Sequence, residues 1–136
     1  MTPRQQELLE QARQAAYQAY APYSRFRVGA AVLADGKIYS GANVENASYG
    51  LALCAERAAL AHARVHGGEK IEGIAVYCLD APADESGAIP QDLALPCGAC
   101  RQWLAELAPE AWLVTNASPT PYRVADLLPH PFRLTR

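Results

Sequence analysis

Three cysteines and one glutamate carry the clearest chemical signal in this chain. Cys54 and Glu56 lie two residues apart, and Cys97 and Cys100 follow much later in a Pro-Cys-Gly-Ala-Cys segment. Three thiolates can hold one zinc ion and leave its fourth tetrahedral position open to water, which is typical of catalytic rather than structural zinc. A carboxylate beside the first ligand is well placed to move protons to and from that water. The pattern predicts one catalytic Zn²⁺ per chain, with Glu56 as the proton carrier.

The three cysteines fall where helices are expected to begin. Cys54 opens an expected helix over residues 53–66, and Cys97 and Cys100 open another over residues 98–107. Residues three apart share one face of a helix, so Cys97 and Cys100 can point at a common ion. The partial positive charge at a helix N-terminus also favours the thiolate form that binds metal.

Arg57 follows the glutamate directly and is expected to act on the sulfur atoms. Three thiolates give a zinc site excess negative charge, which weakens its Lewis acidity, and a guanidinium that donates to a sulfur relieves that excess. An exposed arginine at a helix start is electrostatically unfavourable, which also favours a role in the site.

Two other interpretations of the cysteines remain open. They can be reduced core cysteines that meet by coincidence, or they can hold a structural zinc. A structural zinc needs a fourth protein ligand, and the remaining candidates are Cys78, His62, His66 and His130. Cys78 lies in an apolar run, where a buried thiol acts as a small hydrophobic group. The histidines are not spaced as zinc-ligand partners, so the open, catalytic site is favoured.

Hydrophobic patterning predicts a layered α/β domain, with helices covering a mixed sheet. Asp35-Gly36 is a strong hairpin signal, and residues 80–95 form a long loop that contains two prolines and several acidic residues. With 136 residues, the chain fits one domain over residues 1–136. Helices are expected over residues 3–20, 53–66, 98–107 and, briefly, 123–128, and strands over residues 28–34, 37–44, 73–79 and 111–115.

Composition narrows the class of partner. Hydrophobic residues make up 51% of the chain, charged residues make up 19%, and the net charge is −2, so the chain is globular without being basic. Nucleic-acid binding normally needs a basic patch, so a small nucleoside or base is a better expected substrate than a polynucleotide. The sequence has no apolar run long enough for a membrane span and no signal-peptide core, so a reducing, cytoplasmic location is expected.

Several further segments combine with the cysteine motifs into one ordered pattern. The segments are Pro22-Tyr23-Ser24-x-Phe26-x-Val28-Gly29-Ala30-Ala31, Gly41-x-Asn43-Val44-Glu45-Asn46-Ala47, Cys54-Ala55-Glu56-Arg57, Pro96-Cys97-Gly98-Ala99-Cys100-Arg101-Gln102 and Leu127-Leu128-Pro129 with Phe132. In this order they resemble the small, homotetrameric class of cytidine deaminases. The resemblance implies an α/β/α three-layer fold with a five-stranded mixed sheet, and a homotetramer whose subunits complete each other's active sites.

The resemblance also implies roles for five residues that bind substrate. Asn43 and Glu45 are implied to bond the ribose hydroxyls, and Phe26 to lie against the pyrimidine ring. Tyr49 and Phe132 are implied to contribute near the site of a neighbouring subunit. Side chains at i and i+2 of a strand face the same side, which independently suits a vicinal diol for the Asn43 and Glu45 pair.

The chain departs from its relatives in two places. Arg27 stands where many relatives carry proline, and the loop over residues 80–95 looks longer and more acidic.

The sequence thus predicts hydrolytic deamination of cytidine and deoxycytidine to uridine and deoxyuridine, with release of ammonia, as in pyrimidine salvage. The same signature of a zinc ligand, a neighbouring glutamate and a Pro-Cys-x-x-Cys segment is typical of zinc-dependent deaminases. Alternatives are a deaminase of another aminopyrimidine nucleoside such as an antibiotic, a polynucleotide deaminase, which the acidic balance disfavours, and a zinc-stabilised binding module without catalysis.

Overall fold

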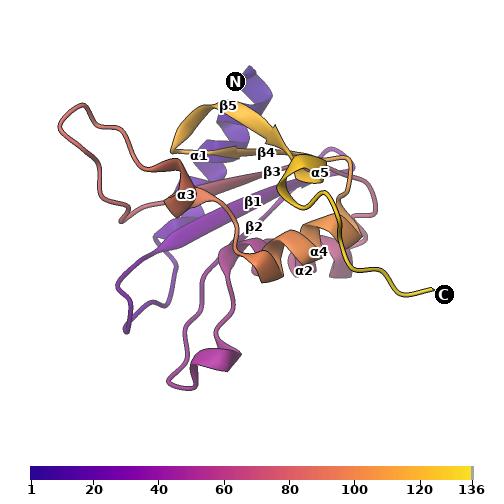
Figure 1. Ribbon diagram of the computed structural model, residues 1–136, viewed down its shortest axis with the longest axis horizontal. Coiled ribbons are helices and arrows are strands. Elements are labelled where there is room, and N and C mark those ends of the chain that lie inside the picture. The colour runs from indigo at the N-terminus through magenta and orange to yellow at the C-terminus, as the bar shows by residue number, and fades with distance from the viewer. Residues whose placement is uncertain (136) are drawn as a thin grey trace.

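A five-stranded mixed sheet forms the centre of the computed structural model, which describes residues 1–135 (Figure 1). The strand order is β2-β1-β3-β4-β5, with β3 and β4 parallel and the other neighbours antiparallel. The strands are β1 (Val28–Ala34), β2 (Lys37–Ala42), β3 (Ile71–Cys78), β4 (Trp112–Thr115) and β5 (Ser118–Arg123).

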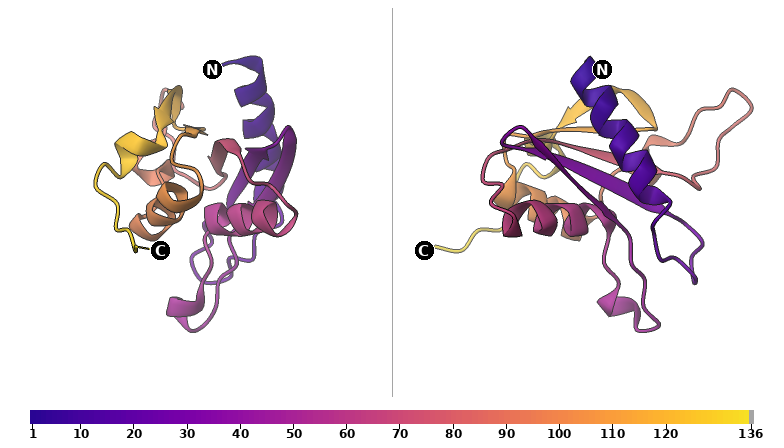
Figure 2. Two further views of the ribbon diagram at one scale, coloured as in Figure 1. Left: turned by 90° about the vertical axis from the view of Figure 1, so that its right-hand side faces the viewer. Right: turned by 180° about the vertical axis from the view of Figure 1, so that it is seen from behind.

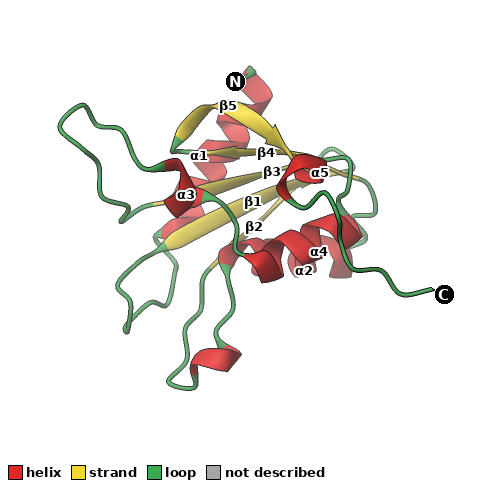
Figure 3. Ribbon diagram, viewed as in Figure 1, coloured by secondary structure: helices red, strands yellow, loops and turns green. Residues whose placement is uncertain are grey.

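Helices cover both faces of this sheet, as Figure 2 shows from two further directions. Helix α1 packs against β1 and β3, whereas α2 packs against β1 and β2 and also contacts α4. The three-layer α/β/α arrangement with a five-stranded mixed sheet is therefore confirmed. The helices are α1 (Pro3–Ala16), α2 (Ala55–Val65), α3 (Gln91–Ala94), α4 (Gly98–Leu107) and α5 (Val124–Leu127), and a 3₁₀ helix η1 spans Tyr49–Leu51. Figure 3 distinguishes them from the loops.

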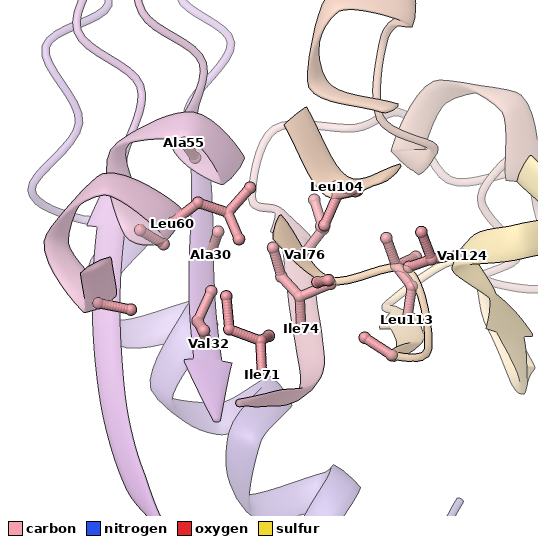
Figure 4. Close-up of a cluster of buried hydrophobic side chains, with 14 of the residues drawn as sticks. Ala30, Val32, Ala55, Leu60, Ile71, Ile74, Val76, Leu104, Leu113 and Val124 are labelled. Atoms are coloured by element: carbon pink, nitrogen blue, oxygen red, sulfur yellow. The ribbon is translucent and has the colours of Figure 1, made fainter. Parts of the chain in front are cut away.

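The alternation of side chains along β1 divides the core into two layers. Ala30 and Val32 belong to the larger cluster, which packs beneath α2 and α4, while Ala31 and Leu33 pack with α1. Figure 4 shows the larger cluster, where Leu60 of α2 lies with the strand residues. Successive strand residues point to opposite faces, and both faces are covered, so β1 reads as a continuous apolar run.

Close backbone packing fixes α2, which carries the first expected zinc ligand at its start. A Cβ atom on Gly41 of β2 would lie 2.5 Å from the backbone nitrogen of Ala59 and 2.9 Å from the carbonyl oxygen of Ala55. Only glycine allows this approach, so β2 sets the distance of α2 from the sheet.

The hairpin and α4 form where the sequence predicts them, but the first helix is shorter than expected. It ends at Ala16 rather than near residue 20. Tyr20 instead forms a bridge with Val44, and its backbone N–H donates to the carbonyl oxygen of Asn43 at 2.9 Å. Val44 also pairs with Leu53. The second strand therefore ends at Ala42 instead of at the expected residue 44. Tertiary pairing thus overrides the local helical pattern.

The patterning of hydrophobic residues did not predict β5, although the resemblance implied a fifth strand. Residues 118–123 contain Pro119 and Pro121, which cannot donate to a ladder. They are tolerated because β5 is an edge strand that pairs only with β4, with Leu113 opposite Tyr122.

Residues 80–90, here called the arm, leave the end of β3 and project from the body of the molecule (Figure 1). Asp84 closes the tip of the arm, because its Oδ1 accepts hydrogen bonds from the backbone N–H groups of Ser86 and Ala88 at 2.8 and 3.0 Å. The chain then returns through α3, a helix within the predicted loop. No helix in the described part of the chain has both the length and the apolar character that a membrane span requires.

Candidate active site

Three thiols meet where α2 and α4 begin. Cys54 occupies the N-cap position of α2, Cys97 occupies that of α4, and Cys100 lies in the first turn of α4. Their Sγ atoms all lie within 4.8 Å of one another, and those of Cys97 and Cys100 are 3.5 Å apart. All three are free cysteines. Among residues 1–135, no histidine or carboxylate joins this group, so the donor set suits a tetrahedral zinc with one open position.

The surroundings of these thiols favour metal binding. A guanidinium nitrogen of Arg57, Nη2, donates to the Sγ atom of Cys54 at 3.3 Å. The pKa of the Cys54 thiol is lowered to about 5, chiefly because Cys100 donates a hydrogen bond to it and further because Arg57 does. The same hydrogen bond and burial raise the pKa of Cys100. The Nε atom of Arg57 is buried without a hydrogen-bond partner in the described structure.

Glu56 lies beside the thiols and is buried, with only 6% of its surface exposed. Burial raises the pKa of Glu56 to about 7, and the negative charge of Cys54 adds to the increase. A carboxyl group whose pKa lies near neutrality can both accept and release a proton at that pH. Burial and a pKa near neutrality suit Glu56 to the expected role of proton carrier.

A cavity of about 190 Å³ lies next to Glu56 and two of the thiols. It is lined by parts of β1 and β3, by the start of α2, and by residues of α3 and of the segment that follows α3. Cys78 is buried there, apart from the three-cysteine group, and its sulfur lies 3.7 Å from the carbonyl oxygen of Leu93. The lining residues are Val28, Asn43, Cys54, Ala55, Glu56, Val76, Cys78, Leu93, Ala94, Leu95 and Cys97.

Asn43 borders this cavity, but its side chain also supports the fold. Its Oδ1 accepts from the backbone N–H of Val28 at 2.8 Å, and its Nδ2 donates to the carbonyl oxygen of Phe26 at 2.9 Å. Phe26 is half-buried against the larger core cluster. Asn43 therefore fixes the entry of the chain into β1 at the edge of the cavity.

Glu45 and Tyr49 line a different hollow, which also includes Tyr23, Ser24 and Ala52. The Glu45 carboxylate accepts the backbone N–H groups of Tyr23 and Ser24 at 3.0 and 3.1 Å, together with the Ser24 hydroxyl. These hydrogen bonds, led by that from the Ser24 side chain, lower the pKa of Glu45. The structure thus places Asn43 and Glu45 in separate hollows of one chain.

Phe132 and Tyr49 do not line the cavity beside the thiols of their own chain. Phe132 is 67% exposed. Tyr49 belongs to the projecting segment that contains η1 and is 78% exposed. Gln102 of α4 holds Phe132 at two points, since its side-chain amide donates to the Phe132 carbonyl at 2.9 Å and accepts from the Phe132 N–H at 3.3 Å.

Arg101 is a supporting residue to which sequence reasoning assigned no role. Its Nε donates to the carbonyl oxygen of Pro96 at 2.8 Å, and its Nη1 donates to that of Leu127 at 2.9 Å. It thereby ties the residue before Cys97 to the C-terminal segment. Its position directly after the last ligand was the only available signal, because both acceptors are backbone atoms.

Comparisons with known proteins agree with this geometry. Residues 2–116 match the family model described as the cytidine and deoxycytidylate deaminase zinc-binding region. A protein of Halalkalibacterium halodurans named cytidine deaminase is 51% identical over 105 residues, which is 76% of this chain and 72% of that protein. One of Mycobacterium tuberculosis with the same name is 44% identical over 124 residues, covering 90% of this chain and 85% of the relative.

Solved structures show the same likeness. The crystal structure of cytidine deaminase from M. tuberculosis superposes with a TM-score of 0.78 at 42% identity, covering 95% of this chain and 97% of that one. That from Burkholderia pseudomallei gives a TM-score of 0.79 at 41% identity, covering 97% and 100%. Fold and thiol cluster together define a zinc-binding deaminase domain. The chain belongs to the cytidine and deoxycytidylate deaminase family.

Proposed function

We propose that this protein is a zinc-dependent cytidine deaminase, which converts cytidine or deoxycytidine and water into uridine or deoxyuridine and ammonia. The observation that carries the proposal is the buried Glu56 beside the three-thiol cluster, at a cavity that two of these thiols line. The names of the relatives from H. halodurans and M. tuberculosis support the choice of cytidine as substrate.

In the proposed mechanism, Cys54, Cys97 and Cys100 hold the zinc, and Glu56 moves the protons. Zinc bound by three thiolates supplies Lewis acidity that favours ionisation of a water molecule near neutral pH. Glu56 would accept a proton from that water as the water oxygen attacks C4, and would donate this proton to the ring nitrogen. It would then take the second proton from the hydroxyl group now on C4 and donate it to the departing amine as the C–N bond breaks. Its raised pKa suits both transfers. Arg57 offsets the negative charge of the thiolates through its bond to Cys54.

We assign substrate positioning to Phe26, Asn43 and Glu45. Asn43 borders the cavity, and its amide keeps one donor hydrogen and one acceptor lone pair beyond the two hydrogen bonds that it makes in the chain. A ribose hydroxyl can use both. Glu45 holds the loop before β1 and would reach the same sugar only from the neighbouring hollow.

We propose a homotetramer whose neighbouring chains supply Tyr49 and Phe132 to each site. The cavity of about 190 Å³ is small compared with the roughly 300–1,000 Å³ of typical ligand pockets, which supports a site completed by another chain. An apolar groove of about 560 Å³ on the outer side of α2 and α4, which includes Val65 and Trp103, gives self-association a surface.

We further propose that residues 1–136 act as one cytoplasmic domain in pyrimidine salvage, on a free nucleoside rather than on nucleic acid. All four cysteines are free, which suits a reducing compartment. The net charge of −2 gives no general attraction to a polynucleotide.

The test compares ammonia release from cytidine by the wild type and by Glu56→Ala, with zinc measured in both. Glu56→Ala should lower kcat by about 10²–10⁴-fold or more, while about one zinc per chain remains. Glu72→Gln, a change at an exposed glutamate of β3 outside the cavity and the groove, is the control and should stay fully active. Full activity in Glu56→Ala would refute the mechanism. Zinc-loaded wild type without activity on cytidine would redirect the assay to other aminopyrimidine nucleosides.

A further inference from the structure

Two histidines lie together at the end of α2 that is farther from the thiols. His62 and His66 are one helical turn apart, and both are exposed. Their rings meet edge to face, with centroids 4.8 Å apart. Tyr39 of β2 packs beside both rings, at centroid distances of 5.4 Å to His62 and 6.1 Å to His66. The pair has no role in the proposed deamination.

Hydrogen bonds to backbone carbonyls determine which nitrogen of each ring is free. The Nδ1 atom of His62 lies 2.9 Å from the carbonyl oxygen of Ser40, and the Nδ1 atom of His66 lies 2.9 Å from that of His62. A carbonyl oxygen can only accept, so each Nδ1 must carry the proton. In the neutral ring the lone pair is then on Nε2. Histidines that bind metal through one nitrogen commonly donate the other N–H to a carbonyl in this way.

The spacing of the two rings also suits a shared ion. Histidines at i and i+4 on a helix lie on one face and can ligate one metal together. Two imidazoles on a tetrahedral ion, with metal–nitrogen distances near 2.0–2.1 Å, have ring centroids about 5 Å apart. The observed centroid separation of 4.8 Å is close to this value.

We propose that His62 and His66 form a second metal site, which binds a divalent transition-metal ion through the two Nε2 atoms, with water in the remaining positions. Paired imidazoles select zinc, nickel or copper over magnesium and calcium. His62 lies eight residues after Cys54, which is about 12 Å along the helix axis, so the two sites cannot share an ion. The site is independent of deaminase activity.

The experiment uses the untagged, zinc-loaded enzyme and Ni²⁺ as the probe. After equilibrium dialysis at pH 7.5, elemental analysis should find about one nickel per chain, with the zinc content unchanged. His62→Gln and His66→Gln should each weaken nickel binding at least tenfold. His130→Gln is the matched control, because it removes the remaining one of the three histidines in the chain and should bind as the wild type does.

Thermal unfolding supplies a second readout that does not depend on catalysis. Nickel should raise the melting temperature of the wild type and His130→Gln, but not that of His62→Gln or His66→Gln, because only a bound ion stabilises the native state. If His62 and His66 only stabilised the fold, the wild type would bind no nickel. Three results would overturn the proposal: no bound nickel, equal binding by both histidine variants and the wild type, or nickel uptake matched by loss of zinc.

Discussion

Arg57 is the cationic residue that contacts the thiol cluster through the Cys54 sulfur. Its Nη2 hydrogen bond to the Cys54 sulfur stabilises the thiolate, and its buried Nε has no hydrogen-bond partner in the described structure. Neither the bond nor the burial follows from sequence. The expectation that Arg57 acts on sulfur came from its place beside Glu56, and the observed contact is consistent with that expectation.

Arg57→Gln should weaken zinc retention by about tenfold to a hundredfold, because the partner that orients and neutralises the ligand is lost. Competition with a chromophoric chelator measures the change. Arg13→Gln, an exposed change on α1 across the sheet, is the control and should retain zinc as the wild type does. Equal retention by all three proteins would show that Arg57 does not support the metal.

Asp80 gives a prediction about acid stability. Arg27 pairs with it through two side-chain bonds, of 2.9 and 2.8 Å, and through a backbone N–H bond of 2.9 Å. The side-chain and backbone bonds from Arg27 lower the pKa of Asp80 from 3.8 to about 2. A lowered pKa means that the pair stabilises the fold above about pH 4, and that this contribution disappears as the pH falls through 2.

Asp80→Asn should therefore unfold at lower denaturant concentration than the wild type at pH 7, and the difference should vanish near pH 2. The partly exposed pair is screened, so the effect at pH 7 is modest. Asp126→Asn, at an exposed carboxylate without an ion pair in the described structure, is the control. A difference that persists unchanged at pH 2 would exclude the ion pair as its cause.

At the scale of elements, local signals predicted those parts of the fold that tertiary contacts do not alter. The apolar run of β1, the Asp35-Gly36 turn and the whole of α4 were predicted with correct bounds. The first helix was predicted too long because Tyr20 pairs with Val44, and β5 was missed because of its prolines. Asn43 and Glu45 bond backbone atoms of residues 23–28, and Glu45 also bonds the Ser24 hydroxyl; no local pattern reveals contacts so far apart in the sequence.

Gly41 links the sheet to the helix that presents Cys54 and Glu56. Gly41→Ala should destabilise the protein by about 1–3 kcal/mol, because the new methyl group meets the backbone of α2. Zinc retention should fall as well, since the start of α2 has to move. Gly50→Ala is the matched control, because a Cβ there has nothing within 4 Å. Denaturant unfolding measures the stability of the two variants. Equal stability of Gly41→Ala and Gly50→Ala would contradict the packing argument.

For the whole molecule, the proposed tetramer predicts complementation between inactive chains. Glu56→Ala has no proton carrier but a normal Phe132, whereas Phe132→Ala has the reverse. If Phe132 serves a neighbouring site, unfolding and refolding the two together should restore activity above the sum of the separate proteins, because mixed assemblies contain some complete sites. Kinetic assay with size measurement tests this, and activity no greater than the sum would place Phe132 outside the neighbour's site.

The arm ends in a tip whose shape is set by its own hydrogen bonds. Asp84 accepts from Ser86 and Ala88, and its backbone N–H donates to the carbonyl oxygen of Ala88 at 2.8 Å. Exposed loop tips of this kind accept inserted sequence well. A peptide that carries a fluorescent label or an immobilisation tag, or a whole partner domain, can therefore be inserted between Ser86 and Gly87. Such an insertion changes only the tip of the arm and leaves the sheet, the helices and the segment that leads to Cys97 unchanged.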